Sequence, residues 1–450
     1  MEDMTLGSPW KLIVRFTIPL LMGNIFQQLY SLMDTIIIGR SLGMNALGAI
    51  GAVGSLTFFV QGFVLGIASG LSLILAQRFG AKNEERIRSS YIASLWISMG
   101  MVLLLTIISI LFSDLLLRMM NIPDELFHDS KAYFITAMFG LSALLFFNLM
   151  CNVLRSKGDT KHLLVFTVFS QLLNIVFDFI FIIVLDFGVS GVAFATILSQ
   201  LIVGVFCQNY VIKKVPIFKL GRKDLRADKR EVRLHLDISL PMGFQSSIIA
   251  VGSIILQYKL NGLGSAAVEG HAIGGRVENM LTMPMVTFGV ATATFAAQNY
   301  GAGDLSRIWR GVKASLIISL SYGLVVGLLL FFYGSDLAQW LFGAESGETI
   351  AFVDRYFKWT TLFYMVLSVV FVVRYCLQGM GKAVAPTIGG FMEMGMRSLV
   401  PLFFTGIFGF RAIVISHPLS WMGTAIVLVV ALYLVKKGDR TTKWKRFLTS

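Results

Sequence analysis

Two aspartates, Asp34 and Asp178, each lie inside a long apolar run of the kind that crosses a membrane as a helix. An acid at the centre of such a helix costs about 2.5–3.5 kcal/mol on insertion scales, so it is typically kept where it binds an ion or a partner. Asn174 precedes Asp178 by four residues and therefore lies on the same helix face. Carboxylate and amide oxygens suit a proton or a hard cation such as Na⁺. We therefore predict a cation site that includes Asp34, Asn174 and Asp178.

Each of these two helices carries a stripe of polar residues on one face. At 100° per residue the stripes are roughly 80° and 60° wide, so each is expected to face away from lipid. Two neighbouring carboxylates resist double ionisation, which makes the pair a good proton acceptor. The stripes consist of Asn24, Gln27, Ser31 and Asp34 in the first helix and Gln171, Asn174 and Asp178 in the second.

Two further predicted helices offer neutral oxygens of the same type, from Asn148 and Thr196. The alternative is that such amides and hydroxyls only make hydrogen bonds between helices, as they often do in membrane bundles. That alternative stays open for Gln27, Asn148 and Thr196.

The composition is that of a membrane protein with many helices. The chain has 450 residues, of which 56% are hydrophobic and 14% charged, and its mean hydropathy is +0.76. A soluble protein carries about 25% charged residues. The first hydrophobic run begins near Leu12 and is long enough to span, so we expect no cleaved signal peptide.

Apolar runs long enough to cross a bilayer recur along the whole chain. Two of them, 46–77 and 267–297, are longer than a bilayer requires, so they are expected to tilt or to continue into a loop. The twelve predicted spans are 12–38, 46–77, 90–112, 131–154, 163–185, 190–212, 237–260, 267–297, 311–333, 354–378, 385–406 and 413–435.

Charge is distributed unequally between alternate connections. The net charge of +13 comes mostly from one set of loops, from the segment Lys213–Arg233 and from the tail Lys436–Arg446. Basic loops stay in the cytoplasm. We therefore predict a multi-pass protein of the plasma membrane, the inner membrane of a bacterium, with both termini cytoplasmic. The basic charge sets topology, so no nucleic-acid partner is expected.

The chain also repeats itself at an offset of 221 to 223 residues. Ile18-Pro19-Leu20 recurs as Leu240-Pro241-Met242, and Ala76–Ala81 recurs as Ala297–Ala302. Each copy holds six predicted spans, so the two halves have the same orientation in the membrane. The predicted domains are an amino-terminal lobe (1–212), a basic cytoplasmic linker (213–236) and a carboxy-terminal lobe with a basic tail (237–450).

The order of these motifs resembles the multidrug and toxic compound extrusion (MATE) family. The resemblance rests on Gln-x-x-Gly-Ala at Gln77–Ala81 and Gln298–Ala302, on Pro19 fifteen residues before Asp34, and on the pair Asn174 and Asp178. It covers the chain from Pro9 to about Val435. It implies an all-α polytopic fold of twelve transmembrane helices in two pseudo-symmetric six-helix bundles.

The resemblance also implies a function. Members of the family export organic, often cationic, drugs or toxins in exchange for H⁺ or Na⁺ by alternating access. We expect a monomer in the lipid bilayer with no cofactor other than the coupling ion, and amphiphilic or cationic small molecules as substrates. The family's cation-coupling positions map onto Asp34, Asn148, Asn174, Asp178 and Thr196, with Gln27 close by.

Proline inside a helix removes a hydrogen bond and kinks it. Pro19 lies about four turns before Asp34, so bending there is one predicted response to cation binding, and a static kink is the alternative. In span two, Gly62, Gly66 and Gly70 repeat every four residues, which lets that helix approach a neighbour closely.

The second half does not copy the acid pair, because Ile255 or Leu256 stands opposite Asp34. Glu393 and Arg397 are four apart and are expected to pair on one helix face. Ion pairs that fix the bundle are one interpretation of the charges in this half, and a substrate site is the other. The candidate substrate-cavity residues are Arg276, Glu278, Met280 and Met283.

Other functions lack their residues in this sequence. His271 and His417 are isolated from other metal-ligand types, and we find no nucleotide-binding loop or nucleophile–base spacing. We therefore predict a transporter and not an enzyme. A lipid-linked oligosaccharide flippase of a related superfamily branch is the alternative, which Arg276, Arg374 and Arg397 keep open.

Overall fold

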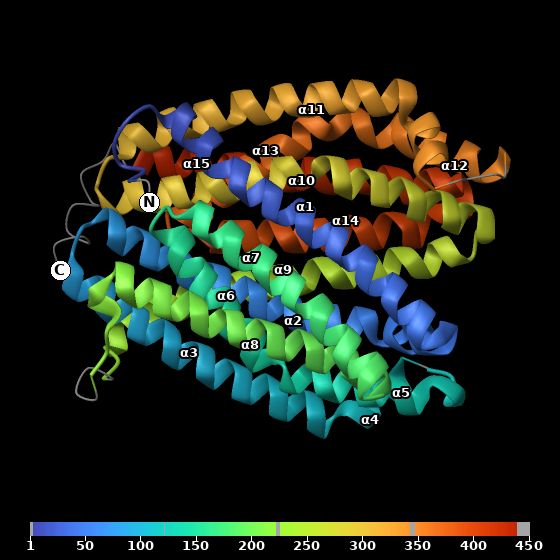
Figure 1. Cartoon of the computed structure of the whole chain (residues 1–450). Coiled ribbons are helices and arrows are strands. Elements are labelled where there is room, and N and C mark those ends of the chain that lie inside the picture. The colour runs from blue at the N-terminus through green and yellow to red at the C-terminus, as the bar shows by residue number, and fades with distance from the viewer. Residues whose placement is uncertain (1–2, 121, 222–225, 343–346, 439–450) are drawn as a thin grey trace. The chain divides into compact units, whose positions relative to one another are not determined.

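Helices make up all the regular secondary structure in the described part of the chain, residues 3–120, 122–221, 226–342 and 347–438 of this computed structural model (Figure 1). Ten of them are long and apolar enough to cross a membrane, and the bent pair α5 and α6 adds an eleventh. The remaining predicted span, 385–406, lies within the 25-residue helix α14. The protein is thus an all-helical, multi-span membrane protein.

The helices of the first half follow one another with short connections. A π-helix, η1, continues α7, and the short 3-10 helix η2 (Pro216–Phe218) follows α8. The elements are α1 (Pro9–Ser41), α2 (Gly43–Gly80), α3 (Glu84–Leu111), α4 (Ser113–Met119), α5 (Asp124–Phe139), α6 (Leu141–Ser156), α7 (Thr160–Asp178), η1 (Phe179–Val184) and α8 (Gly188–Lys214).

The second half repeats the pattern of long helices. A 3-10 turn, η4 (Thr361–Phe363), joins α12 to α13 within one span. The helices are α9 (Lys229–Asn261), α10 (Ser265–Gly301), α11 (Leu305–Phe342), α12 (Gly347–Thr360), α13 (Tyr364–Gly379), α14 (Val384–Phe408) and α15 (Phe410–Gly438).

Close packing groups these helices into two units. The first unit contains Met1–Ser8, Val14–Ser247 and Ala297–Asp304, and the second contains Pro9–Ile13, Ile248–Ala296 and Leu305–Ser450. The first part of α9 and the last turn of α10 therefore pack with the first unit, although both helices belong to the second sequence repeat.

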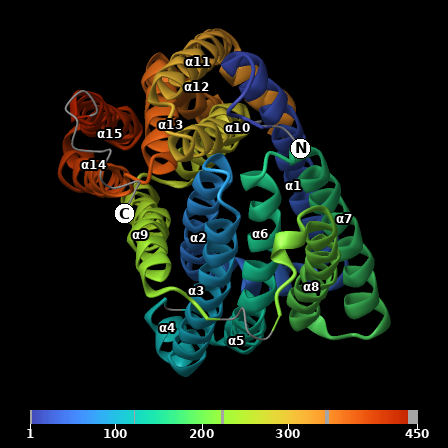
Figure 2. The same cartoon turned by 90° about the vertical axis from the view of Figure 1, so that its left-hand side faces the viewer.

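The core of the first unit is built around α2. Ala68, Leu71 and Ile74 are each fully buried, and α2 contacts α3, α5 and α6. In the end-on view of Figure 2, α2 lies among α3, α6 and α9. An apolar helix that is buried on most sides needs small residues where its neighbours come closest.

The span predicted over 131–154 is broken in the structure. Two helices, α5 and α6, meet at Gly140 with a bend of 43°. A Cβ at Gly140 would lie 2.4 Å from Cγ1 of Ile197 in α8, so only glycine permits this close approach. This contact with α8 is not visible in the local sequence, which predicts an unbroken helix.

The glycine repeat of α2 meets the first part of α9. A Cβ on Gly66 would lie 2.5 Å from the carbonyl oxygen of Met242, and one on Gly70 would lie 2.5 Å from Cα of Ser239. A Cβ on Gly62 would have no neighbouring atom within 4 Å. Two of the three predicted glycines thus allow the close approach of the helices.

Gly66→Ala is expected to lower the melting temperature of the purified protein in detergent. The added methyl overpacks a backbone contact, which costs about 1–3 kcal/mol. Gly62→Ala is the matched control, since its methyl meets open space and alanine favours a helix by about 1 kcal/mol. Equal melting temperatures for the two variants would contradict the close α2–α9 contact.

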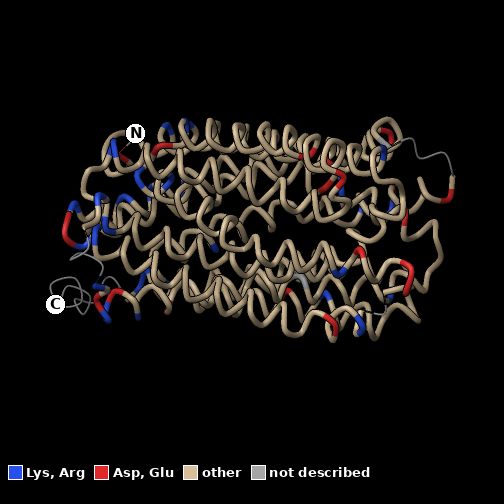
Figure 3. Tube along the Cα trace, turned by 60° about the horizontal axis from the view of Figure 1, so that its bottom comes forward, with Lys and Arg blue, Asp and Glu red and all other residues tan. Residues whose placement is uncertain are grey.

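Lys and Arg gather at one end of the helices in the first unit (Figure 3). We call this end the basic end. It holds the carboxyl end of α2, the start of α3 and the α6–α7 connection. Its basic residues include Arg78, Lys82, Arg86, Arg88, Arg155, Lys157, Lys161, Lys213 and Lys214.

Candidate functional site

The two aspartates of the predicted cation site come together in the first unit. Asp34 lies in α1 and Asp178 is the last residue of α7. Their side chains lie close enough to interact with each other. Asp178 is fully buried, and neither of its oxygens has a hydrogen-bond partner among the described residues. Two carboxyl groups so close and so little solvated can share a proton or bind a cation.

Asn174 lies one turn before Asp178 and is 3% exposed. Its Oδ1 accepts a hydrogen bond from the hydroxyl of Tyr30 in α1, and its Nδ2 has no partner among the described residues. The amide therefore joins α7 to α1 one turn away from the acid pair. The structure thus brings Asp34, Asn174 and Asp178 near one another, and a cation site there stays a prediction.

The other predicted residues lie further from the acid pair or are bound to their own helices. Asn148 donates to the carbonyl oxygen of Leu144 at 2.8 Å, and Thr196 donates to that of Val192 at 3.2 Å. Thr196 is also within reach of the Tyr30 hydroxyl. Gln27 is exposed. Thr196 therefore lies next to Tyr30 at the edge of the site, whereas the Asn148 amide bonds to the backbone of its own helix.

Two tyrosines in the site are absent from the sequence prediction. Tyr30 in α1 and Tyr133 in α5 both lie close enough to Asp34 and Asp178 to feel their charge. Tyr30 is one turn from Asp34, so its spacing was a usable signal. Tyr133 is brought to the site by the packing of α5, and its local sequence carries no such signal.

The backbone changes its hydrogen-bond pattern directly after Asp178. Residues Phe179–Val184 form the π-helix η1, and the N–H of Leu185 bonds to the carbonyl of Ile180 at 2.9 Å. Single π-turns inside membrane helices are frequent at functional sites, because they re-aim a side chain and weaken the local ladder. The turn places Asp178 at the junction of two helix types.

Three charged residues of the second half, Arg374, Glu393 and Arg397, form a separate cluster inside the second unit. Glu393 binds Arg374 at 2.9 Å and Arg397 at 3.1 Å. The predicted pairing of Glu393 with Arg397 is confirmed. Because all three side chains are largely buried, the triad holds α13 to α14 and retains one net positive charge.

The candidate substrate residues of α10 point in different directions. Glu278 is 8% exposed and accepts a hydrogen bond from the Tyr364 hydroxyl at 3.2 Å. Arg276 and Met280 are exposed, and Met283 is half-buried. Glu278 thus lies inside the second unit, whereas its neighbours two residues away lie on its surface.

The expectation that His271 and His417 are isolated is wrong. Their Nε2 atoms are 3.4 Å apart, and both rings lie against Tyr356. The residues are far apart in sequence, so only the packing of α10 against α15 brings them together. Within the described part of the chain, no group of three or more metal-ligating side chains includes them.

Both halves of the chain match a known protein family in sequence. The MatE family model matches residues 19–180 and 241–400, so it matches once in each half at the spacing of the sequence repeat. The chain is similar to the probable multidrug resistance protein YpnP of Bacillus subtilis (strain 168), with 32% identity over 84% of each chain. It is also similar to the probable multidrug resistance protein YoeA of the same organism, at 26% identity over 98% of this chain and 95% of that one.

A solved structure has the same fold. It is described as the outward-facing conformation of a multidrug resistance MATE family transporter of the MOP superfamily. It aligns over 98% of this chain and 99% of that chain with a TM-score of 0.89 and 22% identity.

Proposed function

Because the chain belongs to the MATE family of membrane transporters, we propose that it is a secondary active antiporter that exports organic, often cationic, compounds in exchange for H⁺ or Na⁺. The observation that supports the coupling is the proximity of the fully buried Asp178 to the half-buried Asp34, contributed by two helices of the first unit. A cation that binds there neutralises charge which is otherwise costly to hold in a membrane.

The coupling cycle follows from the chemistry of the pair. With one H⁺ or Na⁺ bound, the pair carries a single net negative charge and its mutual repulsion is relieved, so α1 and α7 can pack closely. Without a cation, two carboxylates repel each other and draw water. A ligand shifts a conformational equilibrium only by its differential affinity for the two states, and this pair supplies that difference for the coupling ion. Asn174, Tyr30 and Thr196 hold the two helices in register around it.

The orientation follows from charge. The basic end carries the lysines and arginines of the α2–α3 and α6–α7 connections and of the last turn of α8, and basic loops stay in the cytoplasm. We place both termini on that side, in the inner membrane of a bacterium. Export then moves substrate away from the basic end, while the coupling ion moves towards it.

Substrate contacts are proposed for the second unit. Met280 and Met283 are flexible, polarisable side chains, of the kind that repack around bulky amphiphiles. Glu278 is the nearby carboxyl for an organic cation, and Tyr364 must release it before a substrate can reach it. Arg276, which is exposed on the same helix, would disfavour cations on its own side.

The triad of the second unit counts against the flippase alternative. A carrier of lipid-linked phosphates needs cationic side chains that are free to bind them. Two of the three arginines in question, Arg374 and Arg397, are held by Glu393.

Everted membrane vesicles from cells that express the chain test the proposal. An imposed pH or sodium gradient should drive ethidium into these vesicles, and an ionophore that collapses the gradient should stop it. Vesicles without the chain are the control. Equal ethidium accumulation with and without the chain, under both gradients, would exclude this function.

Pro19→Ala should separate transport from stability. Pro19 lies inside the continuous helix α1, where proline costs roughly 3 kcal/mol relative to alanine, so the variant should melt at the same or a higher temperature. If bending at Pro19 is part of the cycle, the export rate should fall by roughly tenfold, the equivalent of about 1.4 kcal/mol on a barrier. An unchanged rate would indicate a static kink.

A further inference from the structure

The two Gln-x-x-Gly-Ala segments of the repeat meet each other at the basic end of the first unit. A Cβ on Gly80 would lie 1.8 Å from the carbonyl oxygen of Gln298, and one on Gly301 would lie 1.8 Å from that of Gln77. The contact is reciprocal, and only glycine fits on either side. The carboxyl ends of α2 and α10 therefore cross backbone against backbone.

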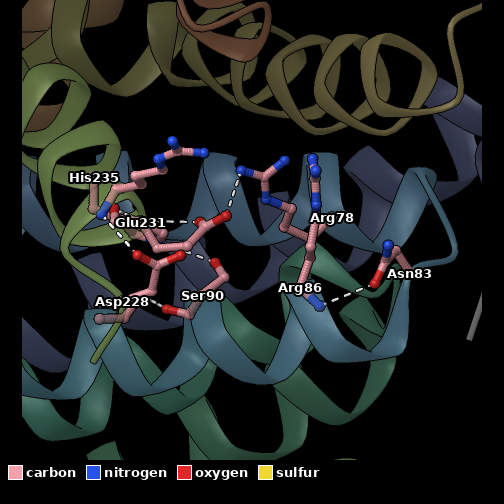
Figure 4. Close-up of polar contacts among 9 residues, drawn as sticks. Arg78, Asn83, Arg86, Ser90, Asp228, Glu231 and His235 are labelled. Carbon is pink, nitrogen blue, oxygen red and sulfur yellow. Dashed lines mark hydrogen bonds and ion pairs between the residues drawn. The ribbon is translucent and has the colours of Figure 1, made fainter. Parts of the chain in front are cut away.

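Arg78, the residue after Gln77, contacts the first turn of α9. Arg78 binds Glu231 in the first turn of α9 at 2.7 Å, and their side chains are 14% and 9% exposed (Figure 4). One turn later, His235 is fully buried. Its Nδ1 donates to the Glu231 carbonyl at 2.7 Å, so its Nε2 accepts from the Ser90 hydroxyl at 2.9 Å.

The second copy of the segment binds Met4, near the amino terminus, by hydrogen bonds. Met4 N–H donates to Oε1 of Gln298 at 3.0 Å, and Nδ2 of Asn299 donates to the Met4 carbonyl at 3.1 Å. Met4 is fully buried. Gln298 also donates to the carbonyl of Ser156 at 2.7 Å, which fixes its amide. A peptide is thus bound through both of its backbone groups and one apolar side chain.

These contacts share one pattern. In each copy, the motif binds residues near the start of the other sequence half: Glu231 in the first turn of α9, and Met4 just before α1. The first contact is the Arg78–Glu231 ion pair. The second consists of hydrogen bonds from neutral amides, because Asn299 stands where the first copy has Arg78. Opening of the basic end in an alternating-access cycle would break both sets of contacts, because each joins segments of different sequence halves.

We propose that the second Gln-x-x-Gly-Ala segment is a binding site for the chain's own amino-terminal peptide, residues 3–5, and that this bound peptide and the Arg78–Glu231 pair together lock the cytoplasmic side closed. The proposal rests on the proposed alternating-access function. The peptide is the removable part, since the ion pair of the adjacent Asp3 with Lys82, at 3.4 Å, is exposed.

Thiol labelling from the cytoplasmic side measures whether the lock is closed. In a variant whose three native cysteines are replaced by serine, Ala297→Cys supplies a thiol at a position that is fully buried beside the site. Everted vesicles present this side to a membrane-impermeant maleimide. Ala81→Cys, at an exposed position directly after the last residue of α2, gives the reference labelling rate.

Met4→Glu should raise the labelling rate of the buried thiol by about five- to tenfold, the equilibrium equivalent of losing one net hydrogen bond. Leu6→Glu adds the same charge at a residue that is 64% exposed and should leave the rate unchanged. Asn299→Ala removes one donor without adding charge and should act as Met4→Glu does. If Met4→Glu does not elute as a single species in detergent and is therefore misfolded, Asn299→Ala alone tests the proposal. Unchanged labelling in Asn299→Ala would overturn the proposal.

Exchanging the two charges tests the Arg78–Glu231 ion pair. Arg78→Glu and Glu231→Arg should each raise labelling, and the two together should restore it to within about twofold, as expected for a directly coupled pair. Arg310→Glu makes the same charge change at an exposed residue and should have no effect. Failure of the exchange to restore slow labelling would remove the ion pair from the lock. Labelling needs neither substrate nor gradient, so it reports on the lock even if the export assay fails.

Discussion

Asp34→Asn and Asp178→Asn should each abolish gradient-driven export in everted vesicles, with initial rates reduced by at least about fiftyfold. Asparagine keeps the shape of the side chain but neither takes up a proton nor supplies charge for Na⁺. Each variant removes a carboxyl group that takes up the coupling ion, and a fiftyfold loss corresponds to about 2.3 kcal/mol on the barrier of the coupled step. The double variant should be no slower than either single variant, because the two carboxyl groups act as one site.

Asp114→Asn is the matched control for these variants. Asp114 is 58% exposed and forms an ion pair with Lys131 in the first unit, so the same chemical change there should leave the rate within about twofold. Unchanged export in both Asp34→Asn and Asp178→Asn would remove the acid pair from coupling. The same vesicles, compared at fixed pH with and without sodium, separate H⁺ coupling from Na⁺ coupling.

Sequence reasoning located the acid pair because helix periodicity alone decides which residues share a face. Asp34 and the Asn174–Asp178 stripe interrupt apolar runs at helical spacing, and two stripes that avoid lipid must face a common interior. The family repeat and the all-helical fold followed from the same regularities. Those features are local in sequence or periodic along it.

The features that sequence reasoning missed depend on packing between distant segments. Tyr133 reaches the acid pair through α5, and the helix is broken at Gly140, where Ile197 of α8 lies close by. His271 and His417 meet through α10 and α15. None of these contacts has a spacing in the sequence that would reveal it, whereas Tyr30, one turn from Asp34, could have been included.

Glu393→Gln should lower the stability of the protein far more than the loss of an acid from an exposed ion pair. Glu393 is 6% exposed and is the common partner of Arg374 and Arg397, so its loss leaves two guanidinium groups without the acid they share. Removing one partner of a buried ion pair costs about 3–5 kcal/mol, because the remaining charge is desolvated and unpaired. The melting temperature of the purified protein in detergent measures the effect.

Asp354→Asn supplies the control for Glu393→Gln in the same unit. Asp354 pairs with Lys358 at 2.7 Å, but their side chains are 38% and 53% exposed, and such a pair contributes about 1 kcal/mol or less. Adding Arg374→Met to Glu393→Gln should recover part of the lost stability, because it removes one of the two uncompensated charges. Equal melting temperatures for Glu393→Gln and Asp354→Asn would mean that water reaches the triad. The second unit would then hold a hydrated charge cluster at this position. Arg374 and Arg397 would again be candidates for binding a substrate.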